Sequence, residues 1–428
     1  MTFAHLGLPA ELLRAIADEG YESPTPIQDR AIPLVREGRD VLAAAQTGTG
    51  KTAAFALPIL ERLNASANTS YSPARHPVRA LVVAPTRELA MQVEASFRAY
   101  ARHLPRLRIA AVYGGVDMDP QTRALRNGVE VLVATPGRLL DHIGQRNTSL
   151  GHVEVLVLDE GDRMLDMGFL PDIRRILALL PAHRQNLLFS ATFSEDIRRL
   201  AGDLLHEPAT VEVAPRNTVA ETVEQLVIPV DRDRKEALLA ALVRRYEIPQ
   251  ALVFTRTKIA ARRLASWLER NGIEAEAIHS DRSQPERTRA LASFKQGEVR
   301  VLVATDVAAR GLDIQELPAV INFELPFDPQ DYIHRIGRTG RAGLSGQAIS
   351  LVCIDEADLL RGIQRLLKTA IPWRVEDGFV PDGEDEPRPL RGPMAGARSP
   401  RSARAGSAPE ARPARRSFPR RARVAEAS

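Results

Sequence analysis

Residues 41–52 read Val-Leu-Ala-Ala-Ala-Gln-Thr-Gly-Thr-Gly-Lys-Thr, a short apolar run followed by a glycine-rich turn and the start of a helical pattern. The order of a strand, such a turn and a helix is typical of a phosphate-binding loop. Gly48 and Gly50 lack the Cβ atom that would collide with phosphate oxygens, so the backbone can approach an anion closely. The N–H groups at the start of the helix then point at that anion. The stretch predicts that the chain binds a nucleoside triphosphate.

The side chains of the loop suit the same ligand. Lys51 offers a point charge to the outer phosphates, and Thr52 offers a hydroxyl to Mg²⁺. Thr47 and Thr49 alternate with the two glycines, and we assign them to nucleotide binding as well. Ala45 stands where the general pattern has its first glycine, which is a small departure from that pattern.

The apolar run of this stretch is the first of many. Further runs in the first half occupy 80–84, 129–134, 153–158 and 186–189, and the pattern restarts with runs at 225–230, 251–255, 275–279, 299–304, 320–323 and 348–353. Runs of this kind, mostly without polar alternation, are typical of strands buried on both faces. Because amphipathic segments lie between them, the sequence predicts the α/β class, with two parallel-sheet domains in tandem.

A chain of 428 residues is too long for one ordinary hydrophobic core. We predict a first domain at 1–206, a linker at 207–222, a second domain at 223–380 and a tail at 381–428. Pro, Gly, Ser, Ala and Arg dominate the tail, which has too few apolar residues to fold and is predicted to be disordered. Because only the first half carries a phosphate-binding loop, a site completed across both domains is expected.

The charge is unevenly distributed. Residues 388–428 hold eleven Arg and two Glu, a net charge of +9, so residues 1–387 carry −5 of the total of +4. A basic tail favours a polyanionic partner.

Composition excludes several classes of protein. With 44% hydrophobic and 26% charged residues the chain is typical of a soluble globular protein. No apolar run approaches about 20 residues, so no membrane span is expected, and the first residues lack the pattern of a secretory signal. The single cysteine, Cys353, lies in an apolar run and is expected to be buried. A disulfide framework is thereby excluded, and a cytoplasmic location is expected.

An acidic turn follows one of the predicted strands. Asp159, Glu160 and Asp162 surround Gly161 directly after the run at 153–158. Carboxylates at the end of a strand can hold Mg²⁺ and position an attacking water, so we assign Asp159 to the metal and Glu160 as the general base. Three carboxylates this close repel one another unless a cation opposes them, which favours a functional site.

A basic motif occupies residues 334–341 in the second half. Arg335, Arg338 and Arg341 would share one face if the segment were helical. Arg338 and Arg341 could then reach the γ-phosphate from the second domain, a contribution worth ~10³–10⁵ in rate where it has been tested.

Together, these segments resemble the DEAD-box ATP-dependent RNA helicases, in that family's order along the chain. The segments that carry the resemblance are Phe3, Gly20–Gln28, Ala45–Thr52, Pro85–Ala90, Gly114–Gly115, Thr135–Arg138, Asp159–Asp162, Ser190–Thr192, Ala304–Ile314 and His334–Arg341. The resemblance extends from Phe3 to about Trp373, and the core with its short basic tail looks most like the bacterial RhlE-type subgroup. It implies two RecA-like domains that close on ATP, Mg²⁺ and one RNA strand, hydrolyse ATP, and locally unwind short RNA duplexes or remodel RNA–protein complexes.

The resemblance also implies roles at the nucleotide. Gln28 would read the adenine edge through two hydrogen bonds, which predicts ATP over GTP. Phe3 would lie near the adenine ring, and Asp313 would contact the ribose from the second domain.

A further group of residues would link hydrolysis to domain closure. Ser190 and Thr192 would bond Asp162, and Arg310 and His334 belong to the same coupling set.

The remaining motif residues would follow RNA phosphates without reading bases. In the first domain they are Pro85, Thr86, Arg87, Gly115, Thr135, Gly137 and Arg138, and in the second domain they are Arg256, Gln284, Arg287, Thr305 and Asp306. The partner is therefore RNA of any sequence. The core is expected to be monomeric, and ribosome-assembly or RNA-decay proteins are candidate partners.

One departure from the family pattern concerns Gly161, because the family has Ala at this position. We expect an active enzyme, slower if the carboxylates are displaced, and we expect Gly161→Ala to leave ATP hydrolysis equal or modestly raised. Two alternatives remain open from the residues: an ATP-gated RNA clamp in which hydrolysis is too slow to matter, and a DNA translocase.

Overall fold

The computed structural model describes residues 2–45, 48–68, 70–104, 107–191, 193–213, 223–309, 314, 317–340, 346–383, 388 and 390. The chain divides into two compact units, one consisting mainly of residues 1–216 and the other mainly of the residues from 217 onward. Several predicted positions lie outside the described residues: Thr47, Thr192, Arg310, Asp313, Arg341 and most of the tail at 381–428.

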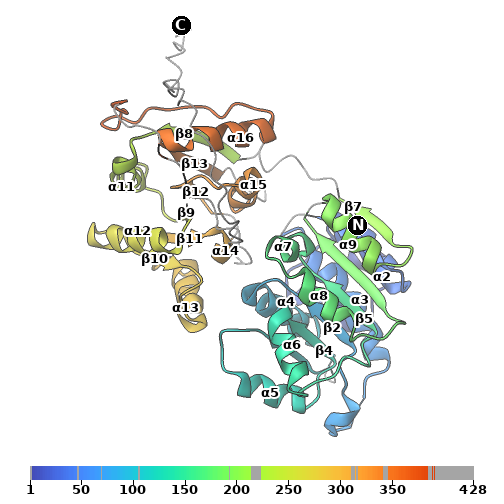
Figure 1. The fold of residues 1–428 in the computed structure, drawn as a ribbon. Helices are drawn as coiled ribbons and strands as arrows, with labels where there is room; N and C mark the ends of the chain where they lie inside the picture. Colours follow the sequence, from blue (N-terminus) through green and yellow to red (C-terminus); the bar gives the residue numbers. More distant parts are fainter. Residues whose placement is uncertain are drawn as a thin grey trace, which may run out of the picture. The chain divides into compact units, whose positions relative to one another are not determined.

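The first unit contains a seven-stranded sheet with the order β3-β4-β2-β5-β6-β1-β7, in which every neighbouring pair is parallel. Strands β2, β4, β5 and β7 of this sheet are labelled in Figure 1. Its strands are β1 (Val41–Ala44), β2 (Ala80–Val83), β3 (Ile109–Val112), β4 (Val131–Ala134), β5 (Val155–Leu158), β6 (Gln185–Ser190) and β7 (Ala209–Glu212). All residues of β1, β2, β4, β5 and β6 are buried, as the unbroken apolar runs predicted.

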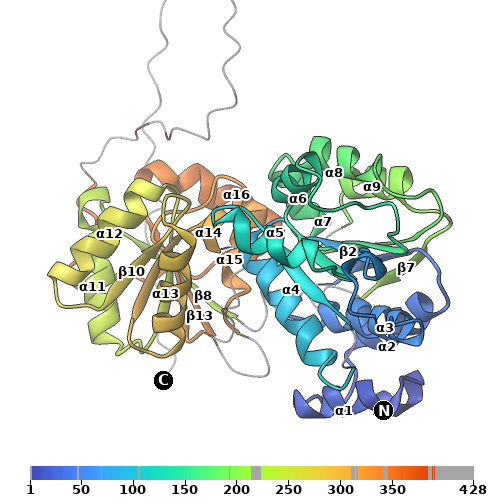
Figure 2. The same ribbon diagram turned by 90° about the horizontal axis from the view of Figure 1, so that it is seen from below.

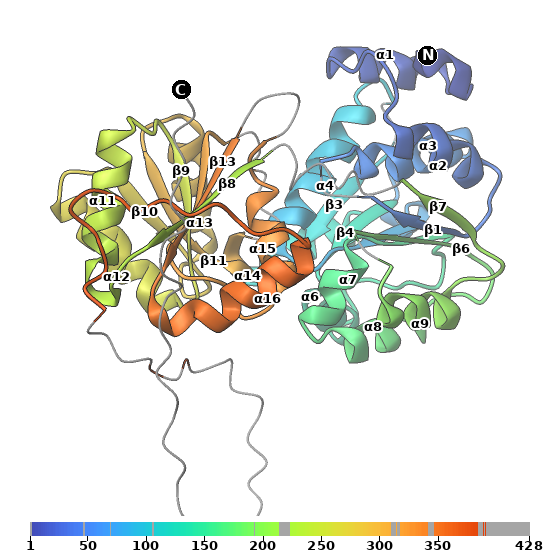
Figure 3. The ribbon, with the colours of Figure 1, turned by 90° about the horizontal axis from the view of Figure 1, so that it is seen from above.

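Helices cover both faces of this sheet. One face packs on α1 (Ala10–Asp18), α2 (Pro26–Arg36), α3 (Lys51–Ala65) and α4 (Arg87–Tyr100), after the short 3-10 turn Phe3–Leu6. The other face packs on α5 (Met118–Arg126), α6 (Pro136–Gly144), α7 (Gly161–Asp166), α8 (Leu170–Leu177) and α9 (Glu195–Leu204). Figure 3 shows α2 and α3 on one side of the sheet and α7, α8 and α9 on the other. Successive strand residues therefore alternate between two separate cores.

The second unit contains a six-stranded parallel sheet with the order β10-β11-β9-β12-β13-β8. Its strands are β8 (Val223–Pro229), β9 (Ala251–Thr255), β10 (Ala275–Ile278), β11 (Val301–Thr305), β12 (Ala319–Asn322) and β13 (Gly346–Val352). Its helices are α11 (Lys235–Arg245), α12 (Lys258–Arg270), α13 (Gln284–Lys295), α14 (Asp306–Ala309), α15 (Pro329–Ile336) and α16 (Ala357–Leu367). Figure 2 shows α11 and α12 on one side of this sheet and α15 and α16 on the other.

The predicted fold class, two RecA-like parallel-sheet domains in tandem, is confirmed. Two local interpretations were wrong. Residues Ala209–Glu212, inside the segment assigned as linker, form β7 and pair with β1. Helix α15 ends at Ile336, so Arg335 and Arg338 do not share one helical face as the spacing suggested. Strand β3 had no predicted counterpart, because its sequence Ile-Ala-Ala-Val is short and weakly apolar.

None of the helices in the described ranges is both long enough and apolar enough to cross a bilayer.

Candidate active site and nucleic-acid interface

The strand order of the first sheet groups the predicted residues into two neighbouring sets. Strands β5, β6 and β1 are adjacent, and their carboxyl ends lead into the acidic turn, the Ser190 segment and the phosphate-binding loop. Strands β3, β4 and β2 are likewise adjacent, and they lead into the first-domain residues predicted to contact RNA. In a parallel α/β sheet, ligands bind at this edge. The carboxyl ends of β5, β6 and β1 therefore carry the residues predicted to bind the nucleotide, and those of β3, β4 and β2 carry the residues predicted to contact RNA.

Lys51 is the main electrostatic feature of the phosphate-binding loop. Gly48 and Gly50 adopt φ values of +83° and +88°, which suit glycine, and α3 begins directly at Lys51. The Lys51 side chain is buried at 6% exposure, and its Nζ has no hydrogen-bond partner among the described residues. A buried ammonium without an acceptor is costly. Its presence at the start of a helix fits an anion that binds there.

Gln28 connects this loop to the segment before α2. Its Oε1 accepts the N–H of Thr25 at 2.9 Å, and its Nε2 donates to the carbonyl of Gly50 at 3.1 Å. A Cβ atom at Gly50 would lie 2.3 Å from that Nε2, so the glycine is required by the close approach of Gln28. The structure thus places the predicted adenine-reading amide against the phosphate-binding loop.

The aromatic residues near the N-terminus differ in their exposure. Phe3 is 4% exposed and packs in the core, where it stacks on Tyr21 with ring centroids 6.5 Å apart. Tyr21 is 41% exposed, and its hydroxyl lies 3.2 Å from that of Tyr100. Tyr21 is the aromatic face open to a ligand on this segment. Sequence reasoning missed it, although it lies seven residues before Gln28.

Asp159 follows β5 and is 2% exposed. Burial raises the pKa of its carboxyl to about 7, against the opposing effect of the nearby Lys51 ammonium. Its Oδ1 accepts the N–H of Glu160 at 3.0 Å, which fixes the start of the turn. A buried carboxylate beside a buried ammonium is a chemically suitable place for a cation and a phosphate group to bind together.

Glu160 lies at the N-terminus of α7 with φ +53° and ψ +55°, a left-handed conformation that costs energy in a residue with a side chain. Its Oε2 accepts a hydrogen bond from Arg163 Nη1 at 3.0 Å, and both side chains are buried. Strain of this kind concentrates at functional sites. Arg163 orients the proposed base, and we did not predict this role. The sequence alone does not show which carboxylate an arginine after an acidic turn will contact.

Asp162 ties α7 to the end of β6. Its Oδ2 accepts the N–H of Ala191 at 3.1 Å, and its Oδ1 accepts the N–H of Arg163 at 3.0 Å. The structure thus brings Asp162 to the Ser190–Thr192 segment through the backbone of Ala191, while Ser190 itself is fully buried.

On the other half of the edge, Thr86 and Arg87 follow β2. The Thr86 hydroxyl accepts the N–H of Leu89 at 3.3 Å and caps α4. The Arg87 guanidinium packs on the turn after β3, where a Cβ atom at Gly115 would lie 2.0 Å from Nη1. Gly115 has φ +77°, a backbone conformation that favours glycine, and any side chain there would also displace the end of Arg87.

Thr135, Gly137 and Arg138 surround the start of α6, directly after β4. Gly137 is exposed, and a Cβ atom there would meet nothing within 4 Å, so the backbone is open to a ligand. Arg138 donates to the carbonyl of Val116 at 3.1 Å, whereas its buried Nη1 has no hydrogen-bond partner within the described ranges. Pro85 is buried at the end of β2 beside this group.

In the second unit, Asp306 has a partner within the domain. Arg335, at 1% exposure, donates to both Asp306 carboxylate oxygens at 2.6 and 2.7 Å and also to Asn322 Oδ1 at 2.9 Å. Its guanidinium lies 4.9 Å from the centre of the Phe254 ring. Arg335 is therefore part of the domain core, and the Asp306 carboxylate is already occupied by it.

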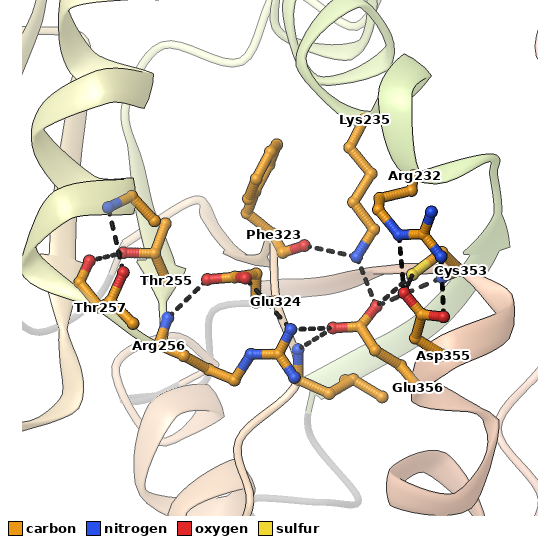
Figure 4. A network of polar contacts seen from close by, with 12 residues as sticks. Arg232, Lys235, Thr255, Arg256, Thr257, Phe323, Glu324, Cys353, Asp355 and Glu356 are labelled. Carbon is orange, nitrogen blue, oxygen red and sulfur yellow. Dashed lines mark hydrogen bonds and ion pairs between the residues drawn. The ribbon is translucent and has the colours of Figure 1, made fainter. Parts of the chain in front are cut away.

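Arg256 lies in a cluster of three cations and three carboxylates (Figure 4). Its backbone N–H and Nη2 donate to Glu324 at 2.7 and 3.1 Å, and Nη2 lies 3.6 Å from Glu356. Lys235 Nζ donates to Glu356 and, at 2.9 Å, to the carbonyl of Phe323.

The same cluster extends to the C-terminal end of β13. Arg232 donates to both oxygens of Asp355 at 2.7 and 2.8 Å. Cys353 is buried as predicted, its N–H donates to Glu356 at 3.3 Å, and burial raises the pKa of its thiol to about 11. The cluster has no net charge, and it fixes the segments around Glu356.

The other residues predicted to contact RNA lie in the first turn of α13 and at the end of β11. Gln284 begins α13 and is 4% exposed, Thr305 ends β11, and Arg287 donates to the carbonyl of Ala308 at 3.5 Å. Both ring nitrogens of His279, at the end of β10, are buried and find no hydrogen-bond partner among the residues that the structure describes, and sequence reasoning missed this residue.

The basic motif lies at the end of α15. His334 is exposed on this helix. Arg338 is 8% exposed and follows the helix, where its carbonyl accepts the N–H of Leu317 at 3.1 Å.

Comparison with known proteins agrees with this arrangement. The family profile "DEAD/DEAH box helicase" matches residues 25–200, and "Helicase conserved C-terminal domain" matches residues 233–343. The chain is 46% identical over 367 residues to the "DEAD-box ATP-dependent RNA helicase CshA" of Geobacillus kaustophilus, covering 86% of this chain and 77% of that protein. It is 44% identical to the "ATP-dependent RNA helicase CshA" of Listeria monocytogenes, covering 86% and 69%. The chain belongs to the DEAD-box helicase family.

Solved structures of DEAD-box helicases share the fold. "S. cerevisiae Dbp5 bound to RNA and ADP BeF3" matches with a TM-score of 0.75 and 32% identity, over 89% of this chain and 95% of that one. "DEAD-box helicase Mss116 bound to ssRNA and UDP-BeF" matches with a TM-score of 0.77 and 28% identity, over 86% and 78%. The chain is thus an RNA-dependent ATPase that locally unwinds RNA or remodels RNA–protein complexes.

Proposed function

We propose that separate groups of residues in this DEAD-box helicase bind ATP and RNA. ATP would bind at the carboxyl ends of β5, β6 and β1, and the RNA backbone would bind at the carboxyl ends of β3, β4 and β2. The buried, unpartnered ammonium of Lys51 supports this assignment best, because a phosphate group supplies the acceptors that it lacks.

Nucleotide recognition would use residues of both domains. Gln28 would read the adenine edge with Phe3 and Tyr21 supplying aromatic surface, and Asp313 would contact the ribose. Thr47, Gly48, Thr49 and Gly50 would surround the phosphates with backbone N–H groups.

Thr52 and Asp159 would hold Mg²⁺. The buried Asp159 carboxylate fits this role, and no group of three or more His, Cys, Asp or Glu side chains among the described residues could hold a metal by itself. The remaining ligands would be phosphate oxygens and water, as Mg²⁺ prefers. When bound, Mg²⁺ neutralises charge on the transferring phosphoryl group.

Glu160 would accept a proton from the attacking water, with its carboxylate oriented by Arg163. Arg338 and Arg341 would stabilise the charge of the transition state after domain closure. Asp162, Ser190, Thr192, Arg310 and His334 would couple that closure to hydrolysis.

RNA would be held through its phosphates by Pro85, Thr86, Arg87, Gly115, Thr135, Gly137 and Arg138, and by Arg256, Gln284, Arg287, Thr305 and Asp306 in the second domain. Because Arg256 and Asp306 already have oppositely charged partners, we expect them to contribute less than Arg138. Contacts of this kind carry no base sequence, so the enzyme would accept RNA of any sequence.

The cellular setting is also a proposal. The core with a short Arg-rich tail supports assignment to the RhlE-type subgroup, although the relatives compared here are called CshA. We propose a cytoplasmic, monomeric core that acts with ribosome-assembly or RNA-decay proteins.

One assay tests the scheme. Phosphate release is measured with ATP or GTP, and with single-stranded RNA, DNA of the same sequence, or no nucleic acid. The proposal expects turnover with ATP that RNA stimulates and DNA does not. Equal stimulation by DNA would favour a translocase, and ATP-dependent RNA binding without turnover would favour a clamp.

A further inference from the structure

One carboxylate, that of Glu324, holds both the backbone and the side chain of Arg256. The backbone N–H of Arg256 donates to Glu324 Oε2 at 2.7 Å, and its Nη2 donates to Glu324 Oε1 at 3.1 Å. Figure 4 shows Glu324 facing Arg256. Backbone N–H groups and guanidinium groups are also the donors that proteins offer to nucleic-acid phosphates. Glu324 therefore occupies the donors that an RNA phosphate would need at this position.

The strand order of the second sheet brings these two residues together. Strand β9 lies beside β12, Arg256 directly follows β9, and Glu324 lies two residues after the end of β12. The N–H of Glu324 donates to the carbonyl of Phe254 at 3.1 Å, which fixes its segment against β9. Because the strands are parallel, both residues lie at the carboxyl edge of the sheet, where ligands bind in folds of this class.

The other charges of the cluster in Figure 4 have their own partners. Lys235 pairs with Glu356, which is completely buried. Arg232 pairs with Asp355 at 2.7 Å. The Glu324 side chain, by contrast, is 21% exposed. Glu324 is therefore the carboxylate that can turn into water without leaving Lys235 or Arg232 unpaired.

Arg256 also has features that suit it to receive a ligand. Its buried Nη1 finds no hydrogen-bond partner in the part of the second unit that is described. Its guanidinium lies 5.2 Å from the centre of the Phe327 ring, a contact that helps to keep the guanidinium in place when a carboxylate leaves. A phosphate could accept from Nη1 and, once Glu324 has moved away, from the donors that Glu324 had occupied.

We infer that Glu324 competes with RNA phosphate for Arg256 and thereby limits the affinity of the helicase for RNA. This inference rests on the proposed role of Arg256 in RNA binding. It gives a cause for the smaller contribution expected of Arg256 than of Arg138. When the charge of Glu324 is removed, Arg256 becomes an additional phosphate contact.

The test is a cycle of four proteins: wild type, Glu324→Gln, Arg256→Gln and the double variant. Fluorescence anisotropy measures the affinity for labelled single-stranded RNA over a salt series, with a non-hydrolysable ATP analogue present. One additional phosphate contact steepens the slope of log K against log salt by ~0.7, which is about fivefold in affinity per tenfold change in salt. Glu324→Gln should bind RNA about fivefold more tightly at about 0.1 M salt, with this steeper slope. The double variant should bind like Arg256→Gln, and Glu324→Ala should show the same gain as Glu324→Gln.

Glu236→Gln is the matched control, because it removes the same single negative charge from the same unit. Glu236 lies in α11, its side chain is 22% exposed, and it pairs with Arg263 at 3.1 Å. Since Arg263 is not a proposed RNA contact, the affinity should change by less than about twofold and the salt slope should stay at the wild-type value. Thermal unfolding of each variant confirms that the proteins compared are folded.

Equal or weaker RNA binding by folded Glu324→Gln would overturn the inference, because Glu324 would then position Arg256 instead of competing for it. A gain that persists in the double variant would show that the effect does not act through Arg256, and would also overturn it. Failure of the proposed RNA site is distinguishable, since Arg138→Gln would then leave the salt slope unchanged as well.

Discussion

Two buried lysines begin helices in the two units, and their surroundings differ completely. Lys51 begins α3 at 6% exposure, and its Nζ has no hydrogen-bond partner in the part of the chain that the structure describes. Lys235 begins α11 at 4% exposure, and its Nζ donates to Glu356 and to the carbonyl of Phe323.

We propose that Lys51 binds a ligand, whereas Lys235 stabilises the fold. A buried charge is tolerated only when something compensates it. For Lys235 the compensation is built into the domain through the fully buried Glu356. For Lys51 the nearby Asp159 carboxylate opposes the charge, but no described residue accepts a hydrogen bond from its Nζ, and we propose that ATP supplies the acceptors. The same contrast distinguishes two arginines. Arg138 has a buried Nη1 without a hydrogen-bond partner among the described residues, whereas the Arg335 guanidinium donates to both carboxylate oxygens of Asp306.

The largest expected effect concerns Lys51. Lys51→Ala should lower ATP hydrolysis by ~10³-fold or more, because the lost charge acts on the transferring phosphoryl group. Phosphate release at saturating RNA measures the loss, and circular dichroism checks the fold. Turnover within a few-fold of wild type in a folded variant would remove Lys51 from the site.

The opposite result is expected at Lys235. Lys235→Met leaves the buried Glu356 carboxylate without its closest cation and should destabilise the second domain by about 3–5 kcal/mol. Urea unfolding, monitored by hydrogen exchange in that domain, measures the change in its free energy of unfolding. Adding Glu356→Gln should recover part of the loss, because the unpaired charge disappears. If Lys235→Met unfolds like wild type, the cluster in Figure 4 has no structural role.

A smaller kinetic effect is expected at the proposed base. Glu160→Gln keeps the shape of the side chain but removes the proton acceptor, so hydrolysis should fall by ~10²-fold. ATP-dependent binding of RNA should persist or tighten, because ATP is no longer hydrolysed and the closed state therefore lasts longer. Parallel loss of RNA binding, measured by fluorescence anisotropy, would indicate a general defect instead.

The smallest effect distinguishes two arginines. Arg138→Gln should reduce the slope of log K against log salt by ~0.7 for single-stranded RNA, because one phosphate contact is lost. Arg256→Gln should change that slope less, since Glu324 and Glu356 already oppose its charge. A larger change for Arg256 than for Arg138 would mean that the ion pairs of Arg256 open to bind RNA.

The sequence predicted the elements that depend on local patterns. The apolar runs at 251–255 and 41–45 correspond to β9 and β1, and the phosphate-binding loop lies between β1 and α3 as expected. These features depend on neighbours in the chain, so a short stretch contains the whole signal.

What the sequence could not predict depends on partners far apart in the chain. Lys235 and Glu356 are separated by 121 positions, and nothing local distinguishes Lys235 from an exposed lysine. Likewise, the hydrogen bond from the Ala191 N–H to Asp162 joins segments that are 29 positions apart. Burial and pairing of this kind are set by tertiary packing, which a motif does not record.

The most direct test is the thermal unfolding of Lys51→Ala and Lys235→Met, each with and without ATP and Mg²⁺. A ligand that binds only the folded state raises its unfolding temperature. We predict that Lys51→Ala unfolds at or above the wild-type temperature without nucleotide and gains nothing from ATP, whereas Lys235→Met unfolds at a lower temperature yet is still stabilised by ATP. If Lys51→Ala unfolded as early as Lys235→Met, or gained as much from ATP as wild type, Lys51 would not be the cation reserved for ATP.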